Sequence, residues 1–90
     1  MPVLGQIIRE IEREAASLST AMLRDEIEIN LEVQDAAISQ YRTIPPGGRT
    51  IEDLIIANST VMVSVLTTAL YVRELAARPV VHATVVISHN

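Results

Sequence analysis

The chain has 90 residues, enough for one domain, and its net charge of −4 at pH 7 argues against the basic surface that nucleic-acid-binding proteins present. The absence of cysteine excludes disulfides, thiol catalysis and cysteine-ligated metals. Apolar residues nevertheless make up 49% of the sequence, which is more apolar surface than a monomer of this size can easily bury.

Residues 3–23 are predicted to form an amphipathic helix, because apolar residues recur there at alternating steps of four and three. This seam is Leu4, Ile8, Ile11, Ala15, Leu18 and Met22. It fits two interpretations: a helix lying on the core of its own domain, or a helix–helix seam shared with another subunit. The charged residues between Arg9 and Glu14 leave no uninterrupted apolar stretch, so we expect no signal peptide.

Residues 26–34 alternate polar and apolar side chains without an error, which predicts a strand. A continuous helix over 3–42 is the competing interpretation, but it would scatter the apolar side chains around the cylinder. Glu26, Glu28 and Glu32 would share the outer face of the strand. Paired carboxylates can act as acid and base or bind Ca²⁺ or Mg²⁺. No ligand from another element accompanies them, so we expect a solvated face.

Residues 35–44 could form either a short helix or a second strand, and they end at Pro45-Pro46-Gly47-Gly48. Two prolines and two glycines favour a turn. The glycines, Arg49 and the helix start that follows are reminiscent of an anion site, but the lysine and the spacing of a phosphate-binding loop are missing. We therefore predict that Pro45–Arg49 is a connector between the two halves of a single domain, 1–90.

A second helix is predicted from Thr50, which can cap it together with Asp53, to the stop signal at Pro79. We assign one face to the domain's own core: Ile51, Leu54, Ile55, Asn58, Met62, Val65, Ala69, Val72 and Ala76. The other side is expected to contact another subunit: Val61, Val63, Leu66 and Leu70. Residues 54–72 also contain no charge and are long enough for a membrane span, although no aromatic belt or positive bias flanks them.

The last predicted element is a strand over residues 80–88, with Val81, Ala83, Val85 and Ile87 on one face. His82 and His89 do not have the spacing of a metal-binding pair. We find no catalytic, metal or cofactor motif in the chain, so we expect neither an enzyme nor a bound cofactor.

Together these elements predict an α+β fold in which two helices pack on a small β-sheet, in the order helix, strand, linker, helix, strand. The function we expect is that of a structural or assembly subunit or adaptor that self-associates and contacts another protein. An accessory virus or phage particle protein, in the cytoplasm or within the particle, is the context we expect. The alternatives are a small acidic regulatory binder and a membrane-attached component. The expected interface is Leu4, Ile8, Ile11, Leu18, Met22, Val61, Val63, Leu66 and Leu70.

Overall fold

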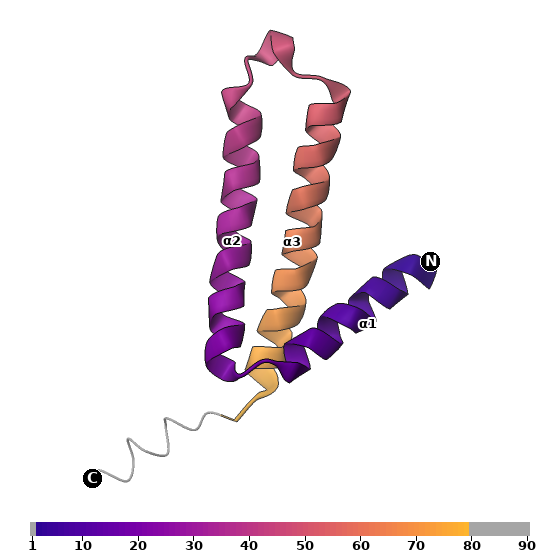
Figure 1. Ribbon diagram of the computed structural model, residues 1–90, viewed down its shortest axis with the longest axis vertical. Coiled ribbons are helices and arrows are strands. Elements are labelled where there is room, and N and C mark those ends of the chain that lie inside the picture. Colours follow the sequence, from indigo (N-terminus) through magenta and orange to yellow (C-terminus); the bar gives the residue numbers. More distant parts are fainter. Residues whose placement is uncertain (1, 80–90) are drawn as a thin grey trace, which may run out of the picture.

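The computed structural model describes residues 2–79 and shows three α-helices (Figure 1). They are α1 (Pro2–Ser17), α2 (Thr20–Thr43) and α3 (Ile51–Ala77), with a short 3₁₀ turn, η1 (Pro46–Gly48), between α2 and α3. The described part of the chain contains no strand. The prediction of an α+β fold is therefore wrong, and this part of the protein is all-α. The predicted strand at 80–88 lies outside the described residues.

The predicted strand at 26–34 lies instead in the middle of α2. The residues of this segment that are turned toward α3 follow a helical period, with steps of four and three from Leu23 to Ile44. Two of these positions, Asn30 and Gln34, are polar, and this hides the helical pattern in the sequence. The apolar residues of the alternating pattern lie mostly on the flanks of α2, where Ile29, Leu31 and Val33 remain exposed.

The predicted helix over 3–23 is interrupted at Leu18 and Ser19, where α1 ends and α2 begins. Ser19 has extended backbone angles, and its hydroxyl accepts a hydrogen bond from the Met22 amide at 3.1 Å, so it caps α2. Met22, the last residue of the predicted seam, consequently lies on α2 and not on the first helix.

The helices α2 and α3 form a long antiparallel hairpin that is closed by the connector (Figure 1). The guanidinium of Arg49 donates hydrogen bonds to the carbonyls of Ile44 and Arg42 and lies 4.9 Å from the centre of the Tyr41 ring. The predicted cap of α3 is confirmed. The Thr50 hydroxyl accepts from the Asp53 amide at 3.1 Å, and the Asp53 carboxylate accepts from the Thr50 amide at 2.9 Å.

The small hydrophobic core lies at the base of the hairpin, where all three helices meet. Ala15, Leu23 and Tyr71 are buried together, and the apolar side chains of Ile11, Leu18, Ile27 and Leu75 pack around them. Arg78, just past the end of α3, donates hydrogen bonds to the Ala15 carbonyl and the Thr20 hydroxyl, which ties the three helices at this end. In its middle, the contact between α2 and α3 is largely polar.

The described chain is extended and flat. Its radius of gyration is 17.6 Å, against roughly 12 Å for a compact domain of this length. Its thickness along the shortest axis is 13 Å, as measured between Cα atoms. The helix α1 contacts α3 near the base of the hairpin and diverges from it on the side away from α2 (Figure 1). Such a shape leaves many apolar side chains of residues 2–79 exposed.

Candidate functional site

The contact between α2 and α3 is hydrogen-bonded along its middle. The Ser64 hydroxyl, which is buried, donates to the Asn30 backbone carbonyl at 2.7 Å. The Gln34 side-chain amide donates to the hydroxyls of Ser64 and Thr68 at 3.2 and 3.4 Å. Among the described residues, no buried polar side-chain atom lacks a partner. Because α3 turns small and polar residues toward α2, its large apolar side chains must point elsewhere.

Many of those side chains form a continuous row along one flank of α3, beside its contact with α2. We call this row the outer stripe: Ile51, Ile55, Asn58, Met62, Val65, Ala69, Val72 and Ala76. Its members follow steps of four and three without exception, and every one of them is exposed. The exposed fraction reaches 72% at Ile51 and 62% at Met62. Leu54 lies beside the stripe and is also exposed.

This spacing is that of a coiled-coil seam. At 3.6 residues per turn, steps of four and three keep the side chains within one narrow band over three and a half heptads. A helix with such a band, when its other side is already packed, is suited to receive another helix. The polar member, Asn58, is bonded within the chain to the Met62 sulfur at 3.5 Å. A polar residue in a seam of this kind typically limits register and partner choice.

The four residues of α3 that the sequence assigned to an interface do not share one face in the structure. Val61 is half-buried beside α2, Leu66 is half-buried, and Leu70 is buried near α1. Only Val63 is largely exposed, at 60%. The face assigned to the domain's own core is the outer stripe, which is exposed in the structure. An apolar pattern around a whole helix cannot show which side its own chain covers.

The interface residues expected on the first helix are divided by the structure into two groups. Ile8, Ile11 and Leu18 are half-buried, and Ile11 and Leu18 pack against the core at the base of the hairpin. Leu4 near the N-terminus of α1 and Met22 on α2 are exposed, at 51% and 54%. Val3 and Ile7, which were not assigned to the seam, are exposed on the same first turns of α1. The N-terminal half of α1 therefore carries apolar side chains that the chain itself does not cover.

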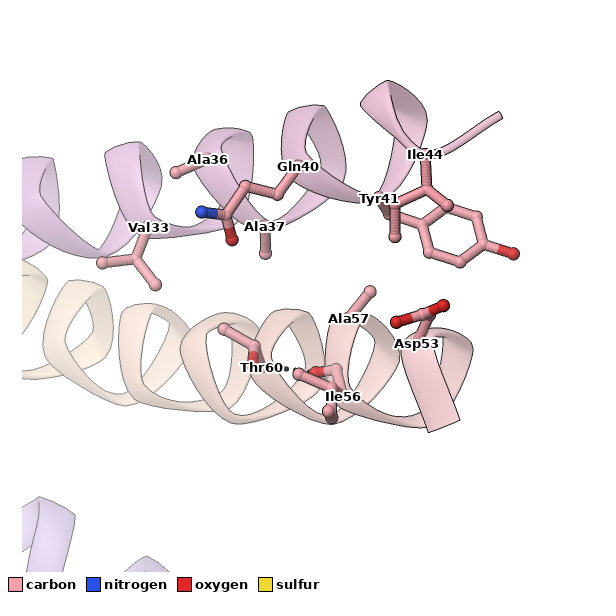
Figure 2. Close-up of a pocket in the computed structure, with 10 residues that line it drawn as sticks. All are labelled: Val33, Ala36, Ala37, Gln40, Tyr41, Ile44, Asp53, Ile56, Ala57 and Thr60. Atoms are coloured by element: carbon pink, nitrogen blue, oxygen red, sulfur yellow. Dashed lines mark hydrogen bonds between the residues drawn. The ribbon is translucent and has the colours of Figure 1, made fainter. Parts of the chain in front are cut away.

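A shallow groove of about 300 Å³ lies between α2 and α3 near the tip of the hairpin. Figure 2 shows Val33, Ala36 and Ala37 on one wall, with Ile56 and Thr60 on the other. The groove exists because alanines occupy the facing positions, including Ala57, where larger side chains would fill the space. Tyr41 and Asp53 lie at the tip end, and the Asp53 carboxylate is engaged in the cap of α3. This geometry suits an apolar side chain and offers no nucleophile paired with a base.

The titratable groups of the described residues do not form a catalytic or metal-binding arrangement. No group of three histidine, aspartate or glutamate side chains within 2–79 could hold a metal ion. Glu28 and Glu32 lie exposed on the outer edge of α2 with Asp25 and Asp35, while Glu26 is half-buried. Hydrogen bonds from the Thr50 amide and hydroxyl lower the pKa of Asp53. Burial, together with the nearby Glu14 and Glu26 carboxylates, raises the pKa of Tyr71.

The helix α3 is long and apolar enough to cross a membrane, and only 11% of its most apolar segment is buried in the chain. By length and composition, it is the one helix among the described residues that meets this condition. The adjacent α2 does not, because charged residues recur along it from Arg24 to Arg42.

The sequence matches no protein-family model, and no curated protein or solved structure is significantly similar to it.

Proposed function

We propose that this protein is a non-enzymatic helical subunit that self-associates, with the outer stripe of α3 as its main contact surface. The observation that carries the proposal is the regularity of that stripe, whose eight members keep heptad spacing and are all exposed. A soluble monomer rarely exposes a continuous apolar patch of this kind, and such patches typically mark interaction sites. The polar outer edge of α2 keeps the opposite side of the hairpin in water.

The exposure of the stripe agrees with this role. Its five large apolar side chains and Leu54 are 46–72% exposed. Removing about half of each large side chain from water is worth roughly 1 kcal/mol, or about 5 kcal/mol per subunit for five of them. This gain is partly offset by the entropy lost on association.

The test is a double substitution at the middle of the stripe, Met62→Asp with Val65→Asp. Both side chains are exposed, Met62 at 62% and Val65 at 49%, so the variant should keep the helical hairpin. It should lose association, because pairing would bury aspartates in the seam without partners. We expect native mass spectrometry to show oligomers for the natural sequence and monomers for the variant, with far-ultraviolet circular dichroism showing similar helix content.

The matched control places two aspartates on the polar outer edge of α2, through Ala21→Asp with Ser39→Asp. This control changes the net charge equally and should leave the oligomer intact, since both positions are exposed on the edge far from α3. The proposal is wrong if the natural sequence is a monomer, or if the stripe variant keeps the oligomeric mass of the natural sequence.

A membrane-attached component is a second candidate, and the apolar length of α3 favours it. In that case α3 would leave α2 and exchange its hydrogen bonds to Asn30 and Gln34 for lipid, at the cost of unpaired polar groups. Flotation with phosphatidylcholine vesicles separates the two candidates. A self-associating subunit stays in the dense fractions without detergent, whereas a membrane component floats with the lipid.

A further inference from the structure

We propose that the second copy binds antiparallel, so that the outer stripe of α3 packs against the same stripe of the partner running in the opposite direction. The inference rests on the proposed function, since it specifies the partner and the orientation for that same surface. A second copy of this chain fits the stripe because two of its features are self-complementary only in that orientation. These features are the sizes of the side chains along the stripe and the charged residues beside it.

The first feature is the distribution of large and small side chains along the stripe. Its centre lies between Met62 and Val65, and an antiparallel copy places residues at equal distances from that centre opposite each other. Ile51 then faces the partner's Ala76, and Asn58 faces the partner's Ala69. Ile55 faces the partner's Val72. Each alanine of the stripe thus meets a longer side chain, and the other layers pair Ile55 with Val72 and Met62 with Val65, so that no layer consists of two alanines.

The second feature is the charge beside the stripe. In heptad terms Glu52 and Arg73 occupy the same flanking position, near opposite ends of α3, and both are exposed. An antiparallel pair brings such positions together across the interface, so Glu52 faces the partner's Arg73, and the pairing occurs twice by symmetry. Arg73 already bonds to Glu12 within the chain, which holds the guanidinium near this end of α3.

A parallel copy would use the same stripe less well. Each residue would then face its own counterpart, so that Ala69 and Ala76 would meet alanines and leave space at one end. Glu52 would find no basic residue, because the positions opposite it, Gly47 and Leu54, are uncharged. Only the Asn58 side chains would gain a hydrogen-bonding partner. Two ion pairs and even packing therefore favour the antiparallel orientation.

Single-cysteine variants test the orientation cleanly, because the natural chain has no cysteine. Ile55→Cys and Val72→Cys are purified separately, mixed under reducing conditions to exchange subunits, and then oxidised or treated with a short bis-maleimide. We expect the mixed cross-linked pair to dominate the products by mass spectrometry. Each variant alone should give no more dimer than Ser39→Cys, the control on the outer edge of α2.

Each other outcome is decisive. Cross-linked homodimers from Ile55→Cys alone and from Val72→Cys alone would show parallel pairing and overturn the inference. Cross-linking at the level of Ser39→Cys, in variants that still sediment as oligomers, would also overturn it, while leaving self-association through another face in place. A monomeric natural protein would overturn the proposed function itself.

Discussion

At the scale of single residues, the hairpin depends on a few polar side chains more than on a large core. Ser64 is the central one, since its hydroxyl both donates to Asn30 and accepts from Gln34. A buried hydroxyl that makes both hydrogen bonds contributes modestly to the free energy of folding. Leaving its buried partners without a hydrogen bond lowers stability by more. The same arrangement fixes the register of α2 against α3, as a polar position in a helical seam usually does.

We predict that Ser64→Ala lowers the free energy of unfolding by about 1 kcal/mol, because Asn30 and Gln34 each lose a partner. Thermal or urea unfolding followed by circular dichroism measures the change. Ser59→Ala is the matched control: Ser59 is exposed on the same helix, and alanine there should leave stability equal or slightly higher. Equal stability of the natural sequence and Ser64→Ala would show that the seam does not support the hairpin.

At the scale of elements, the sequence predicts the start of α3 and the connector well. The Thr50–Asp53 cap and the proline–glycine turn are local signals, and local signals depend on neighbouring residues only. The strand predicted over 26–34 is wrong because a period of two was preferred to a helical seam that contains Asn30 and Gln34. Hydrogen bonds to Ser64, thirty residues and more along the chain, make those two positions suitable for a seam, and no local pattern shows them.

The same limit applies to the candidate site. The sequence shows the heptad spacing from Ile51 to Ala76, but it cannot show whether that face is turned inward or outward. The orientation of α3 is determined by α2, because the polar side chains of α2 form hydrogen bonds with small and polar residues of α3 between Thr60 and Thr68. With that side of α3 turned toward α2, its large apolar side chains face solvent.

The cap of α3 gives a prediction about pH. Folding lowers the pKa of Asp53, so its contribution is present above the ordinary aspartate pKa of about 4 and is lost as pH falls through the lowered value. We expect Asp53→Ala to reduce the melting temperature at pH 7, and this difference from the natural sequence to shrink steadily below pH ~4. Melting curves of both proteins at several pH values measure the effect. A difference that stays constant down to pH ~2 would contradict a role for the ionised carboxylate.

At the scale of the whole molecule, the described chain has more apolar surface than it covers. Among its described residues only Ala15, Leu23, Ser64, Leu70 and Tyr71 are buried, and all but Ser64 lie toward the base of the hairpin. A flat hairpin with this much exposed apolar surface has the properties expected of one part of a larger helical assembly, in line with the proposed function. We therefore expect the chain to be an oligomer in solution.

Sedimentation equilibrium of the natural protein, without detergent and at micromolar concentration, tests that claim most directly. The account predicts a mass of at least two chains of 9.9 kDa, with dissociation only on strong dilution. A single species with the mass of one chain, stable and helical across the whole concentration range, would contradict it.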